Sequence, residues 1–143
     1  MDKPLEGSLH YLRGEYAKAI AEYEREFAFI AASDHALRDR TMIELNVKLG
    51  AAYHRTGSAE DAARYLDRAL KGFDALIANG ADDPFTRYYV ACAHALRGDV
   101  QRALDSLERV AARLPALTAA RIQRDPDLDS LRGHERFQAL IRP

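Results

Sequence analysis

An internal disulfide is excluded, because Cys92 is the only cysteine in the sequence. The same count rules out the paired CxxC motifs of redox and zinc sites, and a reducing compartment is the simplest setting for such a chain. No stretch approaches the roughly 18 uncharged apolar residues of a membrane span, and the amino end carries no apolar signal segment. We therefore expect a soluble cytoplasmic protein.

An excess of charge of one sign is also missing. The 21 Lys and Arg residues are matched by 22 Asp and Glu residues, which leaves a net charge of −1. Proteins that bind nucleic acid or anionic membranes usually carry a basic surplus, so we expect neither partner. The length of 143 residues suffices for one domain with its own core, without a stabilising metal or disulfide.

Motifs for catalysis are lacking as well. The five histidines form no HExxH motif and no pair at i,i+4 spacing, and no GxxxxGK[ST] phosphate loop is present. The acidic groups Asp82-Asp83 and Asp125-Pro126-Asp127 fit helix caps better than a metal site or an acid/base pair. The sequence therefore predicts no enzyme activity, no cofactor and no bound metal.

Apolar residues at helical spacing dominate what is present. In the middle of the chain Leu45, Leu49 and Tyr53 form an apolar stripe, Gly57 interrupts it, and Ala62 begins a second stripe of the same period. This pattern predicts two amphipathic helices that face each other across a glycine turn.

Proline, glycine and capping residues extend this pattern over the whole chain. Ser33 or Asp34 is the predicted N-cap of the third helix, and Asp83 with Pro84 opens the fifth. A short turn is expected from Asp125 onward. The predicted helices cover approximately residues 4–13, 15–32, 34–56, 58–78, 84–97, 99–113, 115–122 and 135–141.

The middle pair of helices recurs on both sides of itself. A shift of 43 residues toward the amino end, or of 41 toward the carboxyl end, superposes glycines and small residues. Small residues let two helices approach to the short end of the usual separation of about 8–10 Å, and the glycines supply the turns. The superposed positions are Gly7, Gly50 and Ala91; Gly14, Gly57 and Gly98; and Ala19, Ala62 and Ala103.

These residues resemble the tetratricopeptide repeat (TPR) family. The spacing of 41–43 residues is similar to the long-helix variant of kinesin light chains and peptide-sensing bacterial regulators, and the tail from Asp125 to Leu140 resembles the closing segment of many bacterial TPR chains. The first copy departs from the family pattern at Glu26, where a small residue is usual. The resemblance is carried by Leu49-Gly50-Ala51-Ala52-Tyr53 followed by Gly57, Ala62, Leu66, Ala69 and Leu70, and by Gly98-Asp99 with Ala103-Leu104.

The resemblance implies an all-α fold, a TPR-like right-handed superhelix of antiparallel helix pairs in a single domain. Its repeats would cover about 4–33, 34–80 and 83–113, with capping helices at about 115–141. In such a fold the first helix of each pair lines a concave groove that binds a protein or peptide. The implied function is a non-catalytic adaptor or scaffold; the alternatives are self-association as a homodimer and a non-catalytic subunit of a larger complex.

The predicted groove is polar in the middle repeat and aromatic in the third. Phe85 and Tyr88 either contact a ligand or pack on the preceding helix or beneath the tail, and Lys48 and Arg55 either capture an acidic peptide or form a solvated face. Family members that hold a chaperone's terminal carboxylate use a basic and asparagine clamp; only Lys48 matches it, so that activity is not expected. The predicted groove residues are Glu44, Val47, Lys48, Ala51, Arg55, Phe85, Tyr88, Tyr89 and Cys92.

Overall fold

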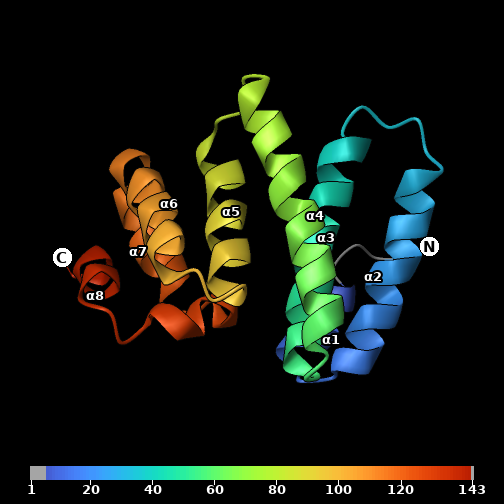
Figure 1. Cartoon of the computed structure of the whole chain (residues 1–143), viewed down its shortest axis with the longest axis horizontal. Helices are drawn as coiled ribbons and strands as arrows, with labels where there is room; N and C mark the ends of the chain where they lie inside the picture. Colours follow the sequence, from blue (N-terminus) through green and yellow to red (C-terminus); the bar gives the residue numbers. More distant parts are fainter. Residues whose placement is uncertain (1–5, 143) are drawn as a thin grey trace. The chain divides into compact units, whose positions relative to one another are not determined.

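The computed structural model describes residues 6–142, and every regular element in that range is helical (Figure 1). The prediction of an all-α protein is therefore confirmed for this part of the chain. Pro4, the predicted first residue of the first helix, lies outside the described residues. The elements are α1 (Glu6–Leu12), α2 (Tyr16–Ala31), α3 (Arg38–Arg55), α4 (Ala59–Ala78), α5 (Pro84–Leu96), α6 (Val100–Arg113), α7 (Pro115–Ile122), the 3-10 helix η1 (Pro126–Leu131) and α8 (Glu135–Ile141).

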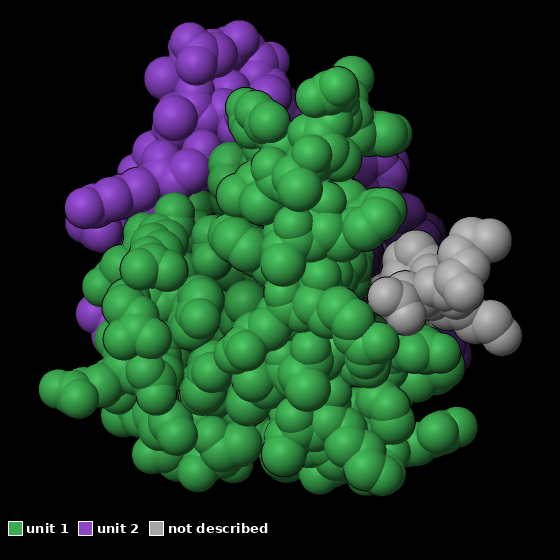
Figure 2. Space-filling view, turned by 90° about the vertical axis from the view of Figure 1, so that its right-hand side faces the viewer, with its two compact units in different colours: residues 1–69 green, residues 70–143 purple. Residues whose placement is uncertain are grey.

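The chain divides into two compact units, residues 1–69 and 70–143 (Figure 2). The first contains α1, α2, α3 and the first half of α4, and the second contains the end of α4 and all later elements. Over residues 6–142, no helix combines the length and the apolar character that crossing a membrane requires.

Within residues 6–142, four helices end at a glycine with the same backbone geometry. One is Gly80, with a φ angle of 99°, and the other three lie at the superposed positions. Gly14, Gly57 and Gly98 have φ angles of 78°, 82° and 82°, a region that glycine enters without steric cost. The residue after each glycine donates its backbone N–H to a carbonyl five residues earlier, which closes the preceding helix. These bonds run from Glu15 to His10 (2.8 Å), from Ser58 to Tyr53 (3.0 Å) and from Asp99 to His94 (2.9 Å).

The first unit packs around Tyr23, Leu45 and Leu49, all with 2% or less of their surface exposed. Its helices approach one another at the predicted small residues. A Cβ atom added to Gly50 would lie 2.5 Å from Cγ of Leu66, and one added to Gly7 would lie 2.6 Å from Cε1 of Tyr23. Larger residues at these two glycines would therefore collide with the facing helix.

The start of α3 was predicted wrongly. Neither Ser33 nor Asp34 caps it, because the helix begins at Arg38 after Leu37, without a side-chain cap. Ser33 instead closes α2: its hydroxyl lies 2.9 Å from the carbonyl oxygen of Ile30, to which it donates. A serine between two helices can serve either neighbour, and here the local bond to the preceding helix is formed.

The second unit follows the predicted capping pattern closely. Asp83 accepts a hydrogen bond from the backbone N–H of Thr86 at 2.9 Å, and Asp99 accepts one from that of Arg102 at 3.3 Å. Helix α5 packs against α6 and η1, and α7 runs beside α6 (Figure 1). The apolar core of this unit includes Phe73, Leu104, Leu107, Ile122, Leu128, Leu131 and Phe137.

Candidate functional site

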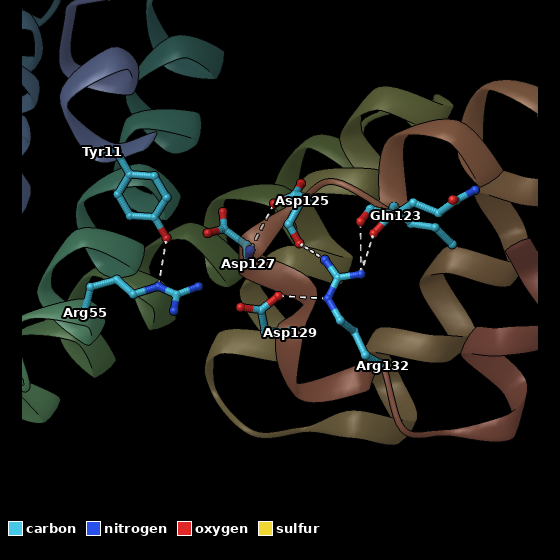
Figure 3. Close-up of polar contacts among 8 residues, drawn as sticks. Tyr11, Arg55, Gln123, Asp125, Asp127, Asp129 and Arg132 are labelled. Carbon is cyan, nitrogen blue, oxygen red and sulfur yellow. Dashed lines mark hydrogen bonds and ion pairs between the residues drawn. The ribbon is translucent and has the colours of Figure 1, made fainter. Parts of the chain in front are cut away.

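The predicted groove residues on α3 differ in their exposure. Val47 and Ala51 are buried, with 2% of their surface exposed, whereas Glu44, Lys48 and Arg55 are partly exposed. Two of the three charged groups have partners on the described chain. Glu44 accepts a hydrogen bond from Arg40 at 3.3 Å. The Nε of Arg55 donates to the hydroxyl of Tyr11 at 3.3 Å (Figure 3).

Lys48 lies close enough to Glu26 on α2 to affect its ionisation. Burial raises the pKa of the Glu26 carboxyl above its usual value, and the positive charge of Lys48 partly opposes that rise. Glu26 is the position where the TPR pattern has a small residue. Helices α2 and α3 thus bring an acidic and a basic side chain together. Contact of Lys48 with a ligand stays a prediction.

On α5, Tyr88 lies beneath the carboxyl-terminal segment and is only 3% exposed. Its hydroxyl donates to Oδ2 of Asp125 at 2.6 Å, and the guanidinium of Arg121 lies 4.0 Å from the centre of its ring. Burial raises the pKa of the Tyr88 hydroxyl above its usual range, so it remains a hydrogen-bond donor. Of the two interpretations that the sequence left open for Tyr88, these contacts match packing beneath the tail.

Cys92 lies one turn after Tyr88 and is buried as well. Its Sγ atom is 3.8 Å from Oδ2 of Asp125, and the possible ligand atoms of Cys92, Asp125 and Asp127 all lie within 4.8 Å of one another. Burial raises the pKa of the thiol well above its usual value, which disfavours the thiolate that binds metals. Asp125 also accepts from the backbone N–H of Asp127 at 3.0 Å, so its role as a helix cap accounts for this cluster.

The two remaining aromatic residues of α5 have different surroundings. Tyr89 is partly exposed, and its ring stacks on Phe73 with 6.1 Å between the centroids. Phe85 is 55% exposed, as is Leu117 on α7. Large apolar side chains that are this exposed are candidates for contact with another molecule.

Phe85 and Leu117 border a shallow hollow between α5, the end of α6 and α7, here called the α5–α7 hollow. Its volume is about 20 Å³, which accommodates about one water molecule or one methyl group. The Oγ1 atom of Thr118 is buried and has no hydrogen-bond partner within residues 6–142. The lining includes Phe85, Tyr88, Leu114, Leu117, Thr118 and Arg121.

The stretch of chain that supplies most of the lining of this hollow is basic. Between residues 109 and 124 there are four arginines and no acidic residue, and all four are exposed. At the ends of the stretch, Glu108 pairs with the guanidinium of Arg136 at 2.6 Å, whereas Asp125 accepts a hydrogen bond from the uncharged hydroxyl of Tyr88 at 2.6 Å. The four residues are Arg109, Arg113, Arg121 and Arg124.

Arg132 holds the segment after α7 in place (Figure 3). Its guanidinium donates to the backbone carbonyls of Ile122, Gln123 and Asp125 at 3.3, 3.2 and 2.8 Å. Its Nε also donates to Asp129 at 2.9 Å. A single forked cation thereby satisfies carbonyl groups at the end of α7 that the helix itself leaves unbonded.

No family model and no solved structure matches the chain. The sequence pointed to Phe85 and Tyr88 but missed Leu117, Thr118 and Arg121. A signal for Arg121 was present, since the stretch 109–124 contains four arginines without an acid, whereas no pattern in the sequence distinguishes Leu117 or Thr118. The net charge of the whole chain does not reveal this stretch, because the two signs nearly cancel over 143 residues.

Proposed function

We propose that the chain is a non-catalytic adaptor that binds a protein or peptide, built from TPR-like helix pairs that stack as a right-handed superhelix. Two features support the repeat. The three glycine turns share one geometry at the superposed positions. Gly7 faces Tyr23 as Gly50 faces Leu66, which is the pairing expected for two copies of one helix pair. In such a fold, partner binding follows from surface that the helix pairs leave uncovered.

The observation that carries the binding function is the exposed apolar rim of the α5–α7 hollow. Phe85 and Leu117 each expose 55% of their surface and line the same hollow. Aromatic residues beside a concavity are enriched among the anchors that supply most of the energy of a protein interface. A partner side chain placed there would contact both residues and remove them from water.

Phe85 can be tested without disturbing the core, whereas Tyr88 is buried and hydrogen-bonded. Peptides selected from a random library on the immobilised chain should lose about tenfold or more in affinity with Phe85→Ser, the loss typical of an interface anchor. The matched control is Phe29→Ser, because Phe29 is 73% exposed on another helix. Affinities would be measured by fluorescence anisotropy, and circular dichroism would confirm that both variants fold.

If the selected peptides bind the wild type and the Phe85 variant equally well, the α5–α7 hollow is not the binding site. If selection enriches no peptide at all, the adaptor function itself is contradicted.

A further inference from the structure

We propose that the α5–α7 hollow binds an acidic peptide segment that inserts one branched aliphatic side chain. The proposal rests on the adaptor function and specifies the chemistry of its partner. Two properties of the hollow carry it: the distribution of charge around it and the size of its apolar opening.

Charge complementarity favours an acidic partner. Arg121 lines the hollow, and Arg124 follows it by three residues, with no acid in the stretch 109–124. Arg109 and Arg113 lie close enough to Asp82 to help lower its pKa, so the carboxylate of Asp82 compensates part of their charge. The guanidinium of Arg121 lies against the face of Tyr88, which orients it without neutralising it.

The apolar part of the hollow limits what can enter it. The enclosed part, about 20 Å³, is close to the size of a methyl group, so it suits the tip of an aliphatic side chain better than an aromatic ring. The tip of a leucine or valine can therefore enter while the rest of that side chain covers Phe85 and Leu117. Arginines near the carboxyl end of α7 also interact favourably with the helix dipole. We infer the charge of the partner from the arginines and the size of its anchor from the apolar opening.

The buried hydroxyl of Thr118 adds a polar feature to the same hollow. It is 3% exposed and has no hydrogen-bond partner within the described part of the chain. A hydroxyl in that position costs stability until an acceptor reaches it. A backbone carbonyl of a peptide that follows the rim could become that acceptor as its side chain enters.

A peptide fits these features better than the other two anionic classes. Anionic membranes attract clusters of roughly four to eight cations on an accessible face, and nucleic acids select a basic surface overall. Here one arginine, Arg121, lines a concave apolar opening, and Arg124 follows it three residues later on a chain whose net charge is −1. A single apolar anchor with acidic neighbours uses all of these features at once.

The probe is a fluorescein-labelled synthetic peptide with one leucine flanked by three glutamates on each side. In anisotropy titrations we expect binding to the wild-type chain that weakens about tenfold with Arg121→Glu, because attraction becomes repulsion. Binding should also weaken with added salt, and when alanine or tryptophan replaces the leucine of the probe. The matched control is Arg68→Glu, because Arg68 also lies over a tyrosine ring, 5.5 Å from the centroid of Tyr65.

Because Arg121 contacts Tyr88, the Arg121→Glu variant could fail to fold. Arg124→Glu is therefore a second variant, at a residue without that contact. Equal binding of a probe with lysines in place of glutamates would overturn the proposal, as would equal loss with Arg68→Glu. Absence of binding by the glutamate probe would overturn it too. If vesicles containing phosphatidylserine sediment the chain through Arg121 while the glutamate probe does not bind, the surface is a membrane site and the proposal is wrong.

The adaptor function and the acidic partner can be tested separately. If peptides of another charge bind in a way that depends on Phe85, the adaptor function stands and the acidic partner is excluded. If peptides bind but none of that binding depends on Phe85, the α5–α7 hollow and the acidic partner are excluded while the adaptor function stands. If no peptide binds at all, both proposals fall together.

Discussion

Individual glycines at helix contacts determine how closely the helices of the first unit pack. Gly50 on α3 faces Leu66 on α4, which is 1% exposed and cannot swing into solvent. The sequence predicted a small residue at this position from the superposed copies alone. The structure adds the reason, because the Leu66 side chain lies where a Cβ of residue 50 would be.

We expect Gly50→Ala to destabilise the chain. Overpacking a core contact costs about 1–3 kcal/mol, whereas replacing a helical glycine by alanine returns about 1 kcal/mol, so a net loss of up to about 2 kcal/mol follows. Urea denaturation followed by circular dichroism would measure it. The double variant with Leu66→Ala should be more stable than the sum of the two single changes implies. Strict additivity would show that the two residues do not compete for space.

Thr118 is a candidate binding residue that could not be predicted from the sequence. Thr118 lies in a short helix with no pattern that distinguishes it from any other buried threonine. Its hydroxyl matters only because no neighbour bonds to it within residues 6–142. Whether a buried hydroxyl finds a partner depends on the positions of atoms from three helices. The spacing of residues along the sequence does not give those positions.

At the scale of elements, local signals located the helix ends wherever a glycine or an Asp-Pro pair was present. Asp83 and Pro84 start α5, and Gly57 follows the end of α3, as predicted. The prediction failed between α2 and α3, where Ser33 bonds backward to α2. Capping residues specify a boundary only when one helix alone can use them.

The carboxyl-terminal segment depends on Arg132, and this gives an element-scale prediction. We expect Arg132→Lys to raise amide hydrogen exchange within residues 123–142 at least several-fold while leaving α2 and α3 unchanged. Lysine keeps the charge but lacks the planar fork that reaches several carbonyls at once. Arg102→Lys is the matched control, since the guanidinium of Arg102 forms an exposed pair with Asp99 at 3.5 Å. Equal protection in wild type and Arg132→Lys would contradict the role assigned to the fork.

At the scale of the whole molecule, the hydrogen bonds and ion pairs of carboxylates link stability to pH. Hydrogen bonds from His10 and Lys18 lower the pKa of Glu15 below 4.5, and the bond from Arg136 does the same for Glu108. A hydrogen bond from Arg87 likewise lowers the pKa of Asp82 below 3.8. The folded chain therefore binds fewer protons at these sites than the unfolded chain in acid.

We expect the melting temperature to fall as the pH drops below about 4.5, because these carboxylates must take up protons on acidification. Thermal melts between neutral pH and pH 3 would measure it.

Glu26 affects stability in the opposite direction. Burial raises its pKa, so its ionisation destabilises the folded chain as the pH rises through that pKa. Glu26→Gln should accordingly raise the melting temperature at neutral pH, and the gain should shrink in acid. A gain independent of pH would contradict the assignment to ionisation.

The sequence by itself determined that the chain is helical, where most helices begin and end, and where small residues bring helices together. These properties depend on spacing along the chain and on backbone preferences that act within a few residues. The tertiary structure decided which of the aromatic residues are covered. It buried Tyr88 under the carboxyl-terminal segment and left Phe85 at the rim of the α5–α7 hollow, beside Arg121. Exposure depends on which distant segment packs against a side chain, and two neighbouring residues of one helix can therefore differ completely.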